Sequence, residues 1–169
     1  MSDEILEIVD EKGNVTGTAT RGEMHRDNTL LHRVVHLLLF NRQGHLLLQK
    51  RSMSKDIEPG TWDTSVGGHV NPGEDITTAL KRETEEELSV TDGDYTFLYR
   101  YIHTNENESE LVYSFCGILN SAVTFNKEEI SEVRFWELEE ITQAIDSGIF
   151  SNNFTDEFRR YMTYVDRSL

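Results

Sequence analysis

The chain has 169 residues and a formal net charge of -15, with 37% hydrophobic and 28% charged residues. This length and composition fit one compact domain with a hydrophobic core, so we expect a single domain over residues 1–169. The negative charge argues against binding to a nucleic-acid polymer, because contact with a phosphate backbone requires a basic surface. A small phosphorylated substrate remains compatible with it, since a bound cation can bridge two sets of negative groups.

Cys116 is the only cysteine, which rules out an internal disulfide and suits a reducing compartment. No basic and apolar signal precedes the first residues, and no apolar run is long enough to cross a bilayer. The sequence therefore predicts a soluble, cytoplasmic protein with no membrane partner.

Strand-like and helix-like segments occur in mixed order along the chain. An N-terminal β-hairpin is expected over residues 5–19, and a second hairpin turns at residues 41–44. Residues 75–88 are good helix formers and predict a helix. A turn rich in Gly, Pro and Asn is expected before it, and Gly67 and Gly68 are predicted to belong to this turn. Mixed strands between helices predict an α/β/α sandwich. The remaining expected segments are a polar connector at 21–31, strands at 34–40, 45–50, 95–102, 110–119 and 132–136, a segment at 57–66 with Trp62 in the core, and helices at 138–147 and 154–164.

In the helix at residues 75–88, apolar residues near the start and three carboxylates near the end share one stripe, at about 100° per residue. Carboxylates three and four residues apart repel one another, and more strongly where they are turned toward the protein. We therefore expect a cation among them, and an oxygen-rich set suits Mg²⁺ or Mn²⁺ better than Zn²⁺. The alternative interpretation is an acidic surface helix in an acidic protein. The residues of this stripe are Ile76, Ala79, Leu80, Glu83, Glu86 and Glu87. The opposite side of the helix, expected to face solvent, carries Thr78, Lys81 and Glu85.

Residues 68–90 resemble the signature of the Nudix hydrolases, G-x5-E-x7-R-E-U-x-E-E-x-G-U, in which U is a large aliphatic residue. Thr84 stands where an aliphatic residue is usual, and it is expected to weaken the packing of the helix. Ser89 stands where Gly is usual for a left-handed helix cap, so this change should cost stability and not chemistry. The matching residues are Gly68, Glu74, Arg82, Glu83, Glu86, Glu87 and Val90.

The resemblance implies the Nudix fold, here an α/β/α sandwich with a mixed β-sheet and the N-terminal β-hairpin. It also implies a metal-dependent pyrophosphohydrolase that cleaves a diphosphate linkage in a nucleoside diphosphate derivative or related metabolite. Arg82 would orient Glu86 through an i, i+4 pair. The general base would be Glu110 or Glu108, or else Glu86, since the family places its base variably. The implied ligands of Mg²⁺ or Mn²⁺ are the Gly68 carbonyl, Glu83, Glu86 and Glu87.

Much of the chain, from Met24 to the middle of the last helix, also resembles the type I isopentenyl diphosphate isomerases, which share the Nudix fold. This second resemblance implies a second candidate metal site. The alternative interpretations of the same residues are a vestige of an isomerase ancestor and a satisfied polar cluster. Arg51 and Lys55 match basic residues that hold the diphosphate in the isomerases. The alternative interpretation is that both are solvated surface cations. The residues that match the isomerase metal site are His25, His32, His69, Glu108 and Glu110.

The isomerase reaction requires a cysteine in a C-G-H sequence, and here the matching sequence is Gly67-Gly68-His69. The pocket tryptophan of the isomerases is matched by Asn153. Because most of the metal-binding acids of the Nudix signature are absent from isomerases and present here, we favour hydrolase chemistry on a small-molecule diphosphate. The alternatives are an isomerase without the usual cysteine and a non-catalytic nucleotide-binding module. The sequence leaves the substrate and the oligomeric state open, although dimers are frequent among relatives.

Overall fold

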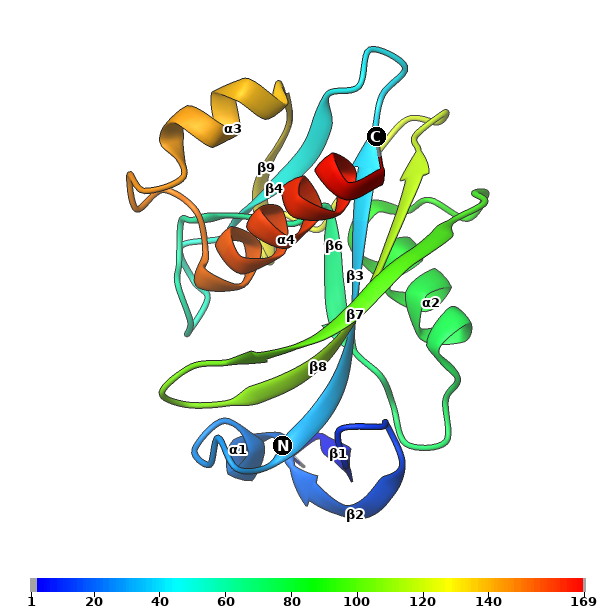
Figure 1. The fold of residues 1–169 in the computed structure, drawn as a ribbon, viewed down its shortest axis with the longest axis vertical. Coiled ribbons are helices and arrows are strands. Elements are labelled where there is room, and N and C mark those ends of the chain that lie inside the picture. Colours follow the sequence, from blue (N-terminus) through cyan, green and yellow to red (C-terminus); the bar gives the residue numbers. More distant parts are fainter. Residues whose placement is uncertain (1–2, 169) are drawn as a thin grey trace.

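The computed structural model describes residues 3–168 of the chain. Its fold is a mixed β-sheet with α2 on one face and α3 and α4 on the other, and a separate β-hairpin lies at one end (Figure 1). The predicted α/β/α sandwich with an N-terminal hairpin is therefore confirmed. In chain order the elements are β1 (Ile5–Val9), β2 (Val15–Thr20), α1 (Arg21–Met24), β3 (Leu31–Phe40), β4 (Leu46–Arg51), β5 (Trp62–Asp63), β6 (Val66–His69), α2 (Ile76–Leu88), β7 (Thr96–Thr104), β8 (Ser109–Ile118), β9 (Ile130–Trp136), α3 (Leu138–Ala144) and α4 (Asn152–Ser168).

The main sheet has the strand order β5-β4-β3-β8-β7, with β6 paired to β3 and β9 paired to β4. Strands β3 and β8 are parallel along their whole length, from Leu31 opposite Ser109 to Phe40 opposite Ile118. The other pairs are antiparallel, which makes the sheet mixed. None of the helices within residues 3–168 is long and apolar enough to cross a membrane.

Two hydrophobic cores lie on opposite faces of the sheet because successive side chains of β3 alternate between the faces. Val35, Leu37 and Leu39 are buried in the core beneath α2. Leu38 is buried in the core beneath α3 and α4, and Trp62 lies in the same core, as predicted. The even-numbered side chains of β3 therefore face α4.

The second predicted hairpin is correct only at its turn. Strands β3 and β4 pair at Phe40 and Leu46 alone, and then they diverge. Strand β6 pairs with β3 from Val34 to Leu37, while β9 pairs with most of β4. The backbone groups of both strands are thus satisfied by strands that come later in the chain.

Two local predictions were wrong. The connector at residues 21–31 contains the short helix α1, whose N-cap Thr20 and Glu23 form a capping box. Gly67 and Gly68 do not belong to the turn before α2, because both lie in strand β6 opposite β3. The turn itself is closed by a hydrogen bond from the Glu74 N–H to the Asn71 carbonyl, at 3.0 Å.

Helix α2 begins after Asp75, whose side chain accepts a hydrogen bond from the Thr78 N–H at 2.8 Å. It ends at Ser89, which adopts the left-handed conformation (φ 57°) that favours Gly, as the signature comparison predicted. The apolar stripe continues through Thr84 and Leu88, both buried. The Thr84 hydroxyl donates to the Leu80 carbonyl at 2.7 Å, so this buried polar group is satisfied.

The prediction that all three acids continue the buried stripe was only partly right. Glu83 and Glu87 are half-buried beside the stripe, whereas the Glu86 side chain is 58% exposed. A stripe at 100° per residue is about as wide as two side chains, so Thr84 and Leu88 take its centre and the acids lie along its edge.

Candidate active site

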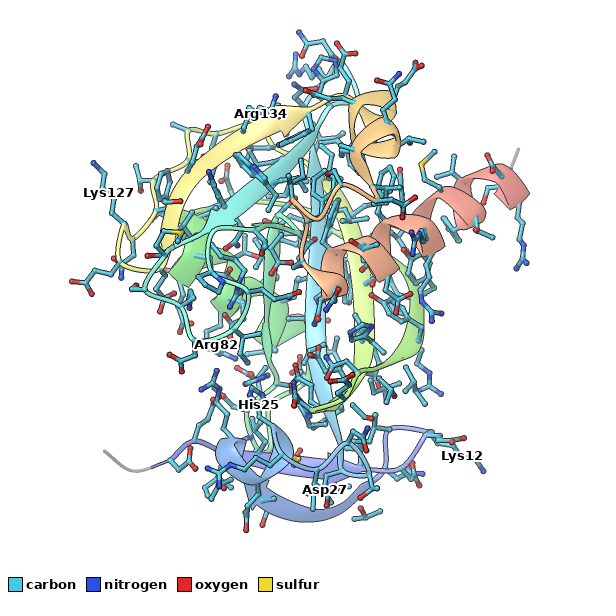
Figure 2. All side chains as sticks on the ribbon, turned by 90° about the vertical axis from the view of Figure 1, so that its left-hand side faces the viewer. Lys12, His25, Asp27, Arg82, Lys127 and Arg134 are labelled. Carbon is cyan, nitrogen blue, oxygen red and sulfur yellow. The ribbon has the colours of Figure 1, made fainter. Side chains whose placement is uncertain are left out.

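A cleft of about 340 Å³ lies where the N-terminal hairpin, the sheet, α2 and the start of α4 meet. Figure 2 shows His25 at the end of the sheet nearest this hairpin. Most of the side chains that the sequence singled out therefore share one cavity, although they come from distant segments. The predicted site residues that line the cleft are His25, Arg51, Lys55, Gly68, His69, Glu83, Glu86, Glu87, Glu108 and Glu110, whereas His32 and Arg82 do not line it.

The acids of α2 approach the backbone of β6. A Cβ atom built on Gly68 would lie 2.5 Å from both carboxylate oxygens of Glu83, so a side chain at this position would require the Glu83 carboxylate to move. Glu87 accepts hydrogen bonds from Gln49 Nε2 at 2.6 Å and from the Gly67 N–H at 3.2 Å. Burial raises the pKa of Glu83 and raises that of Glu87 well above its usual range, where the Glu83 charge adds to the effect.

Arg82 connects these acids to the turn before α2. Its guanidinium donates two hydrogen bonds to Glu74, at 2.8 and 2.9 Å, and one to the His69 carbonyl at 2.9 Å. It also donates to Glu83 at 2.8 Å and to Glu86 at 3.3 Å. The expected i, i+4 contact with Glu86 is present, but the two-pronged contact with Glu74 is the shorter one, and its geometry suits Arg and not Lys.

Three histidines meet at the hairpin end of the cleft. The ring centroids of His25, His32 and His69 lie 5.1 to 6.0 Å apart. Glu108 Oε2 lies 3.0 Å from His25 Nε2 and 3.9 Å from His32 Nε2. Burial, together with the neighbouring His69, lowers the pKa of His32 to about 3, so its ring is neutral at physiological pH.

The ring of His32 has no hydrogen-bond partner for either nitrogen among residues 3–168, although it is buried. Buried polar atoms are normally satisfied, so these nitrogens indicate a missing ligand. One ring nitrogen from each histidine lies within 4.8 Å of the others, and so do ligand atoms of His32, Glu108 and Glu110. Imidazole and carboxylate groups together form a donor set that fits a divalent transition metal.

Glu110 is buried on β8 and accepts a hydrogen bond from Asn153 Nδ2 of α4 at 3.0 Å. Burial and the neighbouring charge of Glu108 raise the pKa of Glu110 above its usual value. A carboxylate whose pKa is raised toward neutrality can accept a proton efficiently at physiological pH. Its position in the cleft beside Glu108 makes it chemically suited to that role.

The two cations expected to hold phosphate also line the cleft. Arg51 is already engaged, because its Nε donates to the Ile57 carbonyl at 3.0 Å and its Nη1 lies 3.3 Å from Asp63 Oδ2. Lys55 lines the same wall, half-buried. Any phosphate contact by Arg51 therefore uses the donors that these two bonds leave over.

Several cleft residues carried no signal in the sequence. Glu4 of the hairpin region lies 3.3 Å from His69 Nδ1, and Arg21 lines the cleft beside it. Gln49 holds Glu87, and His36 forms part of the cleft floor. These side chains come from separate segments of the chain and follow no fixed spacing, so only the fold brings them together.

Comparisons with known proteins agree with this architecture. A model of the NUDIX domain matches residues 30–158. Isopentenyl-diphosphate Delta-isomerase of Citrobacter koseri is 35% identical over 154 residues, which cover 88% of this chain and 85% of the relative. An uncharacterized Nudix hydrolase of Pseudomonas aeruginosa is 34% identical over 132 residues, or 78% of each chain. The crystal structure of DR0079 from Deinococcus radiodurans superposes with a TM-score of 0.81 at 28% identity, covering 93% of this chain and 98% of that one.

The fold, the acidic helix and the glycine strand beside it define a Nudix architecture. The chain belongs to the NUDIX domain family, and its relatives include both isomerases and a hydrolase. The family and the hydrolase relative support the predicted enzyme class, a hydrolase of phosphoric anhydride bonds. Nudix hydrolases generally need a divalent metal ion, and the acids of α2 form a candidate site for one.

Proposed function

We propose that the chain is a pyrophosphohydrolase that cleaves the diphosphate linkage of a small molecule, either a nucleoside diphosphate derivative or a related metabolite. The observation that carries the proposal is the approach of Glu83 to Gly68 inside the cleft. Arg82 offsets part of the charge of Glu83 and Glu86, but no ion pair within residues 3–168 reaches Glu87, so these partly desolvated carboxylates are costly without a further cation. The same arrangement is well suited to a diphosphate bound together with one.

The donor set fits Mg²⁺ or Mn²⁺, because Glu83, Glu86, Glu87 and the Gly68 carbonyl offer only oxygen atoms. Because Gly68 has no side chain, the Glu83 carboxylate can lie directly against the backbone of β6. When bound, such an ion neutralises the diphosphate and lowers the pKa of the attacking water.

The remaining chemistry falls to side chains of the chain itself. Glu110 would take the proton of the attacking water, with Glu108 or Glu86 as the alternative bases. Arg82 would keep Glu83 and Glu86 in place, because it donates a hydrogen bond to each. Water attacks one phosphorus, the bond from this phosphorus to the bridging oxygen breaks, and the leaving phosphate keeps the bridging oxygen.

Arg51 and Lys55, which line the cleft, would contact the diphosphate. The charge of each would offset one negative charge of the substrate, in a cleft whose walls are otherwise mostly acidic. A second ion, bound by His25, His32 and His69 with Glu108 and Glu110, would lie at the hairpin end. A strong preference for Mn²⁺ over Mg²⁺ in the reaction would support participation of this histidine site.

The experiment that tests the function is phosphate release from a panel of substrates. The panel contains nucleoside di- and triphosphates, nucleotide sugars, dinucleoside polyphosphates and isoprenoid diphosphates, each with Mg²⁺ and with Mn²⁺. Release from at least one member, dependent on the metal, is the expected result. Binding of a substrate without turnover would instead favour a non-catalytic module.

The second candidate is an isopentenyl diphosphate isomerase, and the gathered histidine and glutamate cluster favours it. Against it, Gly67 stands where the isomerases have their cysteine, and Cys116 packs at the edge of the core beneath α4, outside the cleft. Incubation with isopentenyl diphosphate and NMR detection of the dimethylallyl isomer decides between the two. Isomer formation at a rate above that of phosphate release would overturn the hydrolase proposal.

A further inference from the structure

His36 connects the cleft to a carboxylate that is completely buried. Its Nδ1 lies 3.2 Å from Oε1 of Glu157, a residue of α4 with 0% exposure. Glu157 also accepts hydrogen bonds from the hydroxyls of Tyr99, at 2.6 Å, and Ser114. Of these three donors only His36 can carry a positive charge, and a buried carboxylate requires one nearby.

The charge state of the His36 ring follows from these neighbours. Burial opposes protonation, but the hydrogen bond and charge of Glu157, with the charges of Glu110 and Asp63, outweigh it and raise the pKa of His36 above its ordinary value. With Nδ1 directed at Glu157, a protonated ring carries its second N–H on Nε2. That N–H is available to a ligand, because the hydrogen bond that the His36 ring forms within residues 3–168 runs through Nδ1, to Glu157.

The Nε2 side of the ring faces the part of the cleft beside Gly67. His36 and Gly67 are opposite each other in the β3–β6 pair, and both line the cleft. A Cβ atom on Gly67 would lie 3.3 Å from Cδ2 and 3.7 Å from Nε2 of His36, so a side chain there would crowd the ring. Because the Gly67 N–H donates to Glu87, the imidazole and this acid of α2 flank the same glycine.

We propose that His36 is a substrate-binding residue, whose Nε2–H donates a hydrogen bond to a non-bridging oxygen of the diphosphate group, and that Glu157 is the positioning residue that fixes its ring. The inference rests on the proposed function for the nature of the ligand. Gly67 contributes by having no side chain between the ring and the cleft. The same imidazole fills space next to the position at which the related isomerases carry their cysteine thiol, so it favours diphosphate binding at the expense of the isomerase site.

The test measures binding of methylenediphosphonate, the non-hydrolysable analogue of diphosphate, by calorimetry in Mg²⁺. In His36→Asn, the amide nitrogen takes the place of Nδ1 and keeps the bond to Glu157 while Nε2 is lost. In His36→Gln, the amide reaches the place of Nε2. His45→Asn, at the turn between β3 and β4 and outside the cleft, is the matched control. Thermal unfolding of each variant verifies that it is folded.

We expect His36→Asn to weaken binding at least tenfold, His36→Gln to weaken it less, and His45→Asn to stay within twofold of wild type. In ¹⁵N-histidine spectra the analogue should shift the Nε2 resonance of His36, and Glu157→Gln should abolish this shift in a folded protein. Affinity of His36→Asn within twofold of wild type, or no binding by the wild type, would overturn the inference. Binding through His36 without release of phosphate from any substrate would overturn the hydrolase proposal alone.

Discussion

The carboxylate of Glu83 occupies the space that a side chain on Gly68 would need, since a Cβ atom there would lie 2.5 Å from both carboxylate oxygens. Real Cβ atoms essentially never approach another heavy atom below 3.0 Å. The contact is possible because β6 presents Gly68 toward α2 and Gly67 toward α4. This one strand therefore lies against Glu83 of α2 at Gly68 and against His36 at Gly67.

Gly68→Ala should displace Glu83 and weaken metal binding. We expect the affinity for Mn²⁺, followed by electron paramagnetic resonance, to fall by about tenfold or more, since one of few ligands is lost. Gly17→Ala is the control, because its Cβ would meet only the Ile8 side chain at 3.7 Å. Unchanged Mn²⁺ binding in Gly68→Ala would show that the Glu83 carboxylate is not a ligand.

Glu87→Gln should lower kcat by two orders of magnitude or more, as the loss of an essential electrostatic group does. The pKa of Glu87 is raised by burial, so folding of the metal-free protein disfavours the charged form of this residue. The metal-free variant should consequently unfold at a higher temperature than the metal-free wild type. Glu85→Gln, on the solvent side of α2, is the control and should keep both properties. Activity of Glu87→Gln within a few-fold of wild type would contradict the assignment.

Arg82→Lys should cost about 1.5–3 kcal/mol of unfolding free energy, because an ammonium group cannot replace the forked contact with Glu74. It should also lower kcat more than it raises KM, since Glu83 and Glu86 lose their donor. Urea denaturation and steady-state kinetics measure the two effects. An Arg82→Lys variant as stable as wild type would mean that the guanidinium network contributes nothing beyond its charge.

His32→Ala should remove one class of metal site and leave the other. Titration of the wild type with Mn²⁺ should show two classes of sites, and the variant only the class formed by the acids of α2. The control is His45→Ala, outside the cleft. A single class in the wild type would mean that the histidine cluster is a polar cluster without a metal.

The ion pair of His103 and Asp156, with Nδ1 and Oδ2 2.7 Å apart, should make stability depend on pH. The bond to Asp156 raises the pKa of His103, so its contribution is complete below the unfolded value of about 6.5 and is lost as pH rises through the folded value. The pKa of Asp156 is lowered by His103 and Arg160, against the effect of burial, so its contribution is lost in acid below about pH 4.

Asp156→Asn should therefore destabilise the metal-free protein most between about pH 4 and 6.5, and less at pH 9. Urea denaturation of both proteins across this range measures the difference. Part of it persists at high pH, because Asp156 also pairs with Arg160 at 2.8 Å. A difference that grows from pH 6 to pH 9 would contradict the assigned direction of the His103 shift.

The acids of α2 were found from the sequence because a helix converts fixed spacing into a fixed face. The degree of burial of these acids was not predicted correctly, because Thr84 and Leu88 occupy the buried centre of the stripe. The Ser89 cap was predictable for the same reason, being a local property of the backbone. Short-range rules thus describe α2 itself well, and the contacts it makes with other elements poorly.

The floor of the cleft could not be predicted in this way. Gln49, His36 and Glu157 come from three elements, and their contacts span 38 to 121 positions of sequence. The splaying of β3 from β4 likewise depends on β6 and β9, which follow later in the chain. The histidine cluster was proposed only through its resemblance to the isomerases, since no spacing rule joins His25 to Glu108.

The measurement that tests the account most directly compares phosphate release by the wild type and by Glu87→Gln across the substrate panel, with Mg²⁺ and with Mn²⁺. We predict metal-dependent release by the wild type from at least one diphosphate-containing compound, and a loss of two orders of magnitude or more in the folded variant. Equal release by both proteins would contradict the proposed metal site. Silence of the wild type across the panel, together with conversion of isopentenyl diphosphate, would contradict the hydrolase function itself.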